Sequence, residues 1–164
     1  MLSNTNAKSI WCIIYNGGVK VKIRNLLTDD IESLARLYFQ FWNEQSDIER
    51  MKNKFNDLMN NKSYIFLCAV ENDELIGSVM GIVCEELYGN CKPFLLVENM
   101  VVDRTYRKKG IGKALFSELE KRAKNLDCTQ IILVTETDRK DACGFYESIG
   151  FHSTANKGYK KKLL

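Results

Sequence analysis

A short glycine-containing segment, Arg107-Lys108-Lys109-Gly110-Ile111-Gly112-Lys113, joins an expected strand to an expected helix. At such a junction the first N–H groups of the helix lack partners, and the positive end of the helix dipole points toward the loop. The two glycines let the backbone approach a ligand closely, and four basic side chains add positive charge. The segment matches neither a Walker A loop nor a dinucleotide fingerprint. We expect it to bind a phosphate-like anion.

Glu98 is the only charged residue inside the apolar run from Phe94 to Val102. A carboxylate in a buried strand is costly unless it has a partner or a function. Beside a reactive carbonyl, Glu98 could take a proton from an amine, directly or through a water, because an amine must be neutral to attack. The alternative is a glutamate at an exposed strand end or one paired with a structural arginine. For the neighbouring Asn99 we expect a structural hydrogen bond.

These residues must be positioned by a mixed set of elements in the order β-α-α-β-β-β-α-β-α-β. Alternation and helical spacing predict strands and helices over these ranges: a strand from Val21, helices within 29–42 and 48–61, strands at 64–70, 75–83 and 94–102, a helix from 111, a strand at 130–135, a helix at 141–148 and a strand at 159–164. Strict alternation in the third of these strands would place Leu96, Glu98, Met100 and Val102 on one face. The sequence therefore predicts a single α/β domain.

A second motif comes after the next expected helix and strand. It is Ala142-Cys143-Gly144-Phe145-Tyr146-Glu147-Ser148-Ile149-Gly150-Phe151. Together, the strand with Glu98, the R-x-x-G-x-G loop and this segment resemble the acetyl-CoA-binding core of the GCN5-related N-acetyltransferases (GNAT). The resemblance covers Val21 to Leu164 in element order. It implies a single-domain mixed, mostly antiparallel sheet with splayed central strands, flanked by helices.

The resemblance also implies where acetyl-CoA, the cosubstrate, would bind. The loop from Arg107 to Lys113 would wrap the pyrophosphate, and the pantetheine arm would lie between the strands at 94–102 and 130–135. The expected backbone partners of that arm are Met100, Val101 and Val102. Arg139 and Phe145 are further cofactor-binding candidates, although many members have Asn where this chain has Arg139.

Tyr146 is the second catalytic candidate, because a tyrosine at this position of the family commonly lies near the thioester sulfur. A phenol with a pKa of about 10 can protonate a departing thiolate. The alternative role is packing beside Phe145.

A backbone N–H at Met100 or Val101, freed by a bulge where the strands splay, would polarise the acetyl carbonyl. Cys143 has no histidine nearby in the sequence to activate it, which favours direct attack over a covalent acetyl-enzyme.

Charge and cysteine usage narrow the functional classes. Residues 1–103 hold 10 basic and 14 acidic residues, whereas residues 104–164 hold 14 basic and 7 acidic residues. This asymmetry indicates an anionic ligand for the second part and a neutral or cationic one for the first.

The six cysteines form no C-x-x-C pair and His152 is the only histidine, so we expect reduced thiols, no metal and a cytoplasmic protein. We expect neither nucleic acid nor membrane as a partner, and a homodimer stays open.

For the first 20 residues two alternatives stay open. They are either an over-extended gene start, or an N-terminal arm or extra edge strand through Ile10 to Tyr15. The acetyltransferase domain is expected at 21–164. The predicted reaction moves an acetyl group from acetyl-CoA to a primary amine within a ternary complex. The acidic first part of the chain favours a small cationic acceptor, such as a polyamine or an aminoglycoside, over a phosphorylated sugar. The acceptor should lie against the helix pair at 29–61 and the turn at 150–158. The alternatives are a protein N-acetyltransferase and a non-catalytic acyl-CoA sensor on the same fold.

Overall fold

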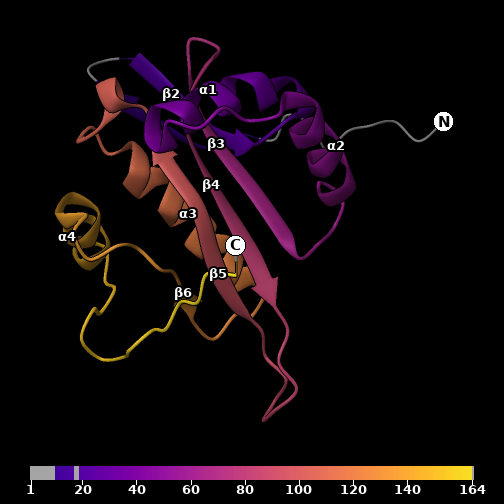
Figure 1. The fold of residues 1–164 in the computed structure, drawn as a ribbon, viewed down its shortest axis with the longest axis vertical. Coiled ribbons are helices and arrows are strands. Elements are labelled where there is room, and N and C mark those ends of the chain that lie inside the picture. The colour runs from indigo at the N-terminus through magenta and orange to yellow at the C-terminus, as the bar shows by residue number, and fades with distance from the viewer. Residues whose placement is uncertain (1–9, 17–18, 164) are drawn as a thin grey trace. The chain divides into compact units, whose positions relative to one another are not determined.

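The computed structural model describes residues 10–16 and 19–163, and Figure 1 shows the course of the chain. Contacts divide the chain into a first unit that ends at Ile132 and a second unit that begins at Leu133. The first unit contains β1 (Ile10–Asn16), β2 (Val19–Asn25), η1 (Thr28–Asp30), α1 (Ile31–Trp42), α2 (Ile48–Leu58), β3 (Tyr64–Glu71), β4 (Glu74–Cys84), β5 (Phe94–Val102), η2 (Arg104–Tyr106), α3 (Ile111–Asn125) and β6 (Ile131–Ile132). The second unit contains α4 (Lys140–Ser148).

Within the described residues the strands form one six-stranded sheet in the order β1-β2-β3-β4-β5-β6. All neighbours are antiparallel except β5 and β6, which are parallel. β1 pairs with β2 at one edge, as the edge-strand alternative for Ile10 to Tyr15 expected. The hypothesis of a start at Val21 also concerns residues 1–9 and 17–18, which lie outside the described residues, and it stays a prediction.

Helix α3 covers one face of the sheet, which we call the α3 face. Its buried side chains recur every four residues, at Ile111, Leu115 and Leu119, as the helical spacing predicted. The helix packs so close to β4 that a Cβ atom built on Gly81 would lie 2.8 Å from a methyl carbon of Leu119. A larger residue at this position would force the Leu119 side chain to move, so the close helix–sheet packing favours glycine here.

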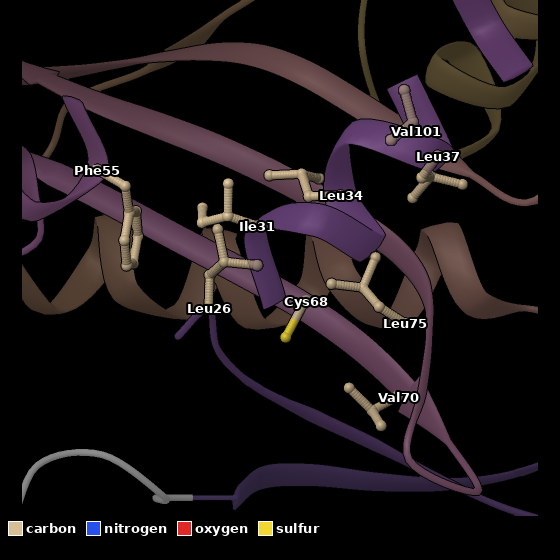
Figure 2. Close-up of a cluster of buried hydrophobic side chains, with 9 residues drawn as sticks. All are labelled: Leu26, Ile31, Leu34, Leu37, Phe55, Cys68, Val70, Leu75 and Val101. Carbon is tan, nitrogen blue, oxygen red and sulfur yellow. The ribbon is translucent and has the colours of Figure 1, made fainter. Parts of the chain in front are cut away.

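Helices α1 and α2 pack against the opposite face, which we call the α1 face. Figure 2 shows the buried cluster that they form with the strands. Its members are Leu26, Ile31, Leu34, Leu37, Phe55, Cys68, Val70, Leu75 and Val101. The turn before α1 is fixed by Asp30, whose carboxylate pairs with Arg24 at 2.6 Å and accepts a hydrogen bond from the Leu27 N–H at 2.8 Å.

Strand β5 contains a bulge at Asn99–Met100. Glu98 pairs with Met80 and Val101 pairs with Ser78, so one residue of β4 lies opposite two residues of β5. Asn99 has a φ of 52°, in the left-handed region that asparagine tolerates better than most residues. The extra residue bends β5 and interrupts its ladder.

The bulge makes the strict alternation predicted for β5 wrong beyond Glu98. Val101 lies on the α1 face together with Glu98, as its place in the buried cluster shows. Val102 pairs with Gly77, which contacts α3, and so lies on the α3 face. The resemblance implied a bulge that frees a backbone N–H at Met100 or Val101, and the observed bulge lies at this place. The strict alternation predicted for the strand did not include the extra residue.

Two predicted strands are shorter or missing. β6 covers only Ile131–Ile132 of the expected strand at 130–135, and residues 159–163 form no strand. In the part of the chain that the structure describes, none of the helices has the length and apolar character needed to cross a membrane.

Candidate functional site

The predicted anion-binding loop lies between η2 and α3, at the end of the bulged strand. Gly110 caps the helix with a φ of 81°, a conformation that favours glycine, and its carbonyl accepts the Ala114 N–H at 3.0 Å. The N–H groups of Ile111, Gly112 and Lys113 then form the first helical turn, where no earlier carbonyl of the helix is available to them. A Cβ atom built on Gly110 would meet no atom within 4 Å, so no distant side chain crowds this glycine.

A network around Asp103 holds this loop to α1. The Asp103 carboxylate accepts hydrogen bonds from the Gln40 amide at 2.7 Å and from the Thr105 N–H at 2.8 Å. Desolvation opposes ionisation, but these hydrogen bonds together lower the pKa of Asp103. Arg104 donates to the Gln40 carbonyl. Asp103 is therefore an ionised anchor between the end of α1 and the start of the loop.

The basic side chains of the loop rest on aromatic rings and backbone. The Arg107 guanidinium donates to the Val102 carbonyl at 3.2 Å and lies 6.0 Å from the centroid of the Phe41 ring. The Lys109 ammonium lies 5.1 Å from the centroid of the Tyr106 ring. Such contacts orient a cation without neutralising it, so these charges stay available to an anion.

Tyr106 is itself held by a buried acid at the end of β3. Its hydroxyl donates a hydrogen bond to Glu71, which raises the pKa of the Tyr106 phenol. Glu71 is buried, and its Oε1 atom has no hydrogen-bond partner among the described residues. The pair thus connects the sheet to the ring that supports Lys109. Nothing in the sequence pattern indicates this pairing across 35 residues of chain.

The bulge places Glu98 and Asn99 side by side with different surroundings. Glu98 is exposed on the α1 face, which differs from the expectation of a buried carboxylate. Asn99 is hydrogen-bonded to the hydroxyl of Tyr38 on α1, as expected for a structural hydrogen bond. Burial raises the pKa of the Tyr38 phenol well above its ordinary value, with this hydrogen bond opposing the shift. Tyr38 therefore stays neutral and fixes the bulge.

The three residues predicted to pair with pantetheine follow the point where β5 separates from β6. The parallel ladder joins Leu95 to Ile131 and Leu96 to Ile132, and no further pair of these two strands exists among the described residues. Met100, Val101 and Val102 lie on the part of β5 beyond this ladder. The first unit thus contains the diverging strand, the exposed Glu98 and the loop that is predicted to bind an anion.

Arg139, Phe145 and Tyr146 belong to the second unit. Arg139 lies at the N-terminus of α4, with its guanidinium 3.7 Å from the Glu136 carboxylate. The Tyr146 ring contacts Phe145 and Phe151 edge to face, with centroids 5.2 and 5.8 Å apart. Gly150, with a φ of 98°, ends α4 and lets the Phe151 N–H reach the Tyr146 carbonyl at 3.1 Å. The packing role considered for Tyr146 therefore has these two contacts in its favour.

Sequence reasoning missed the residues that support the site, above all Gln40, Asp103, Tyr106 and Glu71. Their partners lie on other elements, so no local spacing reveals them. Only Asp103 carried a usable signal, because an Asp two residues before Thr105 is typical of a turn in which the side chain accepts a backbone N–H.

Comparisons with known proteins agree with this geometry. Residues 29–151 match the acetyltransferase (GNAT) family. An acetyltransferase of Pectobacterium atrosepticum is 31% identical over 150 residues, which cover 88% of this chain and 96% of that protein. A solved transcriptional regulator from Bacillus halodurans superimposes with a TM-score of 0.79 at 23% identity, over 87% of this chain and 99% of the other.

An aminoglycoside N-acetyltransferase solved in complex with CoA superimposes with a TM-score of 0.75 at 17% identity, over 90% of this chain and 97% of the other. At such identities the two structures show a shared fold alone. They confirm the expected α/β architecture, a mixed, mostly antiparallel sheet flanked by helices.

Proposed function

Because this chain belongs to the acetyltransferase (GNAT) family, we propose that it moves an acetyl group from acetyl-CoA to the primary amine of a small cationic acceptor, by direct attack in a ternary complex. The family makes the chain an acetyltransferase. The proposal concerns the donor site, the acceptor and the residues that act on them.

The observation that carries the proposal is the divergence of β5 from β6 beside an anion-binding loop. The part of β5 from Met100 to Val102 extends past the ladder with β6, so an extended amide-containing arm such as pantetheine could pair with it. The loop that follows offers first-turn N–H groups, open space at Gly110 and four exposed basic residues. Both features fit coenzyme A, whose pyrophosphate is anionic and whose pantetheine arm carries two amides.

The chemistry then assigns one proton to each candidate residue. The amine nitrogen attacks the carbonyl carbon of the thioester, the carbon–sulfur bond breaks, and an amide and a thiolate result. Glu98 accepts the proton that the amine loses, directly or through a water. Tyr146 donates a proton to the thiolate, and a backbone N–H of the bulge at Met100 or Val101 polarises the carbonyl.

A cationic acceptor is favoured by the distribution of acids in the first unit. Exposed or half-buried carboxylates follow α1 and β4, close in the chain to the elements that flank Glu98. They are Glu44, Asp47, Glu49, Glu85 and Glu86. Such a field raises the local concentration of an ammonium ion over that of a phosphorylated sugar.

The decisive experiment measures thiol release from acetyl-CoA over a panel of primary amines, with wild type, Glu98→Gln and Glu120→Gln. Glu120 lies on α3 in an ion pair with Lys124 and serves as the control for loss of a carboxylate. We expect Glu98→Gln to lower kcat by roughly 10²-fold or more and to abolish the acidic limb of the pH–rate profile. CoA affinity should not change.

Two results would contradict the proposal. An intact acidic limb in Glu98→Gln would assign proton removal to water or to the acceptor itself. Binding of acetyl-CoA without transfer to any amine or to protein lysines and N-termini would instead identify a non-catalytic sensor.

A further inference from the structure

One half of the α1 face carries side chains that are only half-buried, while their neighbours on the α3 face are buried. Along β3, β4 and β5 the burial alternates strictly in this region: Ile65, Gly81, Val83, Leu95 and Val97 are buried. The residues between them are half-buried or exposed. We call these eight residues the open face: Tyr64, Phe66, Met80, Ile82, Cys84, Phe94, Leu96 and Glu98.

The strand register places these residues together. Tyr64 pairs with Ile82 and Phe66 with Met80, while on the other side of β4 Ile82 pairs with Leu96. Directly opposed residues of antiparallel strands share a face and bring their Cβ atoms to about 5 Å from each other. The open face is therefore a continuous apolar surface across three strands.

Glu98 is the single carboxylate of the open face, and it lies at the edge nearest the bulge. Its cross-strand partner is Met80, which is followed across β4 by Phe66. Phe66 stacks with Tyr64 at a centroid distance of 6.0 Å and meets Phe55 of α2 at 5.3 Å. One negative charge thus borders an aromatic and aliphatic surface.

We propose that the acceptor is a monoamine with an apolar body, whose ammonium group lies at Glu98 and whose aromatic or branched aliphatic part rests on the open face. This inference rests on the proposed function and names the substrate class for it. Within the eight residues of the open face the charge complementarity is one to one, because Glu98 is the only carboxylate among them. A second ammonium on the acceptor would lie over Met80, Ile82 or Leu96 without a counter-charge.

The energetic reason is the cost of moving a charge onto apolar surface. Desolvation of an unpaired ammonium outweighs the weak attraction it gains, whereas covering apolar side chains with an apolar body is favourable. Polyamines and aminoglycosides, which carry several cations, should therefore be poor acceptors compared with a monoamine of similar size.

The first test compares kcat/KM for 2-phenylethylamine, spermidine and an aminoglycoside in the wild-type protein. We expect a preference of at least ~10-fold for 2-phenylethylamine, the scale on which apolar pockets discriminate. A preference for spermidine or the aminoglycoside would overturn the inference and leave the proposed function intact. Transfer to none of them would count against both.

A binding measurement separates these failures. With methyl-labelled methionine, the Met80 signal of the CoA-loaded protein should shift when 2-phenylethylamine is added and should not shift with spermidine. A Met80 signal that moves with protein concentration alone would assign the open face to a second copy of the chain. A Met80 signal unmoved by 2-phenylethylamine would remove the inference.

The variant test reverses the specificity. Met80→Glu adds a second carboxylate opposite Glu98, so the ratio of kcat/KM for spermidine to that for 2-phenylethylamine should rise by at least ~10-fold. Ile13→Glu is the matched control, because Ile13 is an exposed apolar residue on β1, the edge strand at the opposite edge of the sheet from β6. An equal change in both variants, or none in Met80→Glu with its fold retained by circular dichroism, would contradict the inference.

Discussion

Glu98 and Asn99 are adjacent polar residues in the same strand, but their surroundings separate their roles. The Asn99 side chain is engaged by Tyr38, and its positive φ makes the bulge. Glu98 is left exposed beside it, where an amine can approach. At this scale one inserted residue decides which side chains share a face with Glu98, since without the bulge Val101 would lie on the opposite face.

Tyr146 is the residue whose two roles can be separated by one atom. If its hydroxyl protonates the leaving thiolate, Tyr146→Phe should lower kcat by roughly 10²-fold while the melting temperature and CoA affinity stay nearly constant. The ring contacts with Phe145 and Phe151 are kept in this variant. Tyr159→Phe, which changes an exposed tyrosine, is the control.

Wild-type kcat in Tyr146→Phe would leave packing as the only role of the tyrosine. Single-turnover measurements are required for this conclusion, because slow product release would hide a slower chemical step.

At the scale of elements, the segment from Asp103 to Lys113 forms one connection between β5 and α3. It leaves the bulged strand, is tied to α1 through Gln40 and Arg104, and enters α3 through the left-handed Gly110. The loop that we predict to bind an anion is thereby fixed at both ends.

The variant Gly112→Asp tests whether this segment binds the phosphates of CoA. A carboxylate in the first turn of α3 would lie where the phosphate is expected, so CoA affinity should fall at least tenfold, about 1.4 kcal/mol. Calorimetric titration with CoA measures the effect, and Ser117→Asp, which adds the same charge at an exposed position further along α3, is the control. Unchanged affinity in folded Gly112→Asp would remove the anion site.

The β3–β4 hairpin offers a stability test of a second element. Asn72 and Asp73 connect paired Glu71 and Glu74 with φ angles of 50° and 63°, the geometry of a two-residue turn that prefers Asn-Gly. Asp73→Gly should raise the free energy of unfolding by about 0.5 to 1 kcal/mol in a denaturant titration. Asp73→Ala removes the charge but keeps the Cβ atom, so an equal gain in both variants would assign the effect to charge.

At the scale of the whole molecule, charge is divided along the chain. Residues 104–164 hold twice as many basic as acidic residues, and the loop from Arg107 to Lys113 contributes four of the basic ones. We expect the Kd for CoA to rise several-fold between low and high salt, because exposed charges are screened. Lys113→Gln should weaken the dependence of this Kd on salt, and Lys54→Gln, at an exposed lysine of α2, should not. A salt-independent Kd would contradict an electrostatic contribution from the loop.

The sequence alone determined most of the helices and strands up to Val102, the helix that begins at Ile111, and the place of the glycine-containing loop before it. These features depend on local periods and on residues close together in the chain, such as Gly110 and the run Ile111, Leu115 and Leu119. The resemblance carried by the two motifs also pointed to the family that the comparisons show.

Only the tertiary structure decided which face each residue of β5 occupies and which side chains support the loop. The bulge at Asn99 is set by pairing with β4 and by Tyr38 of α1, and both partners are distant in sequence. The open face is likewise decided by the tertiary structure, since half-buried Met80 and buried Val79 are both apolar strand residues in the sequence. Local propensity cannot encode such contacts, because they depend on elements that meet only after folding.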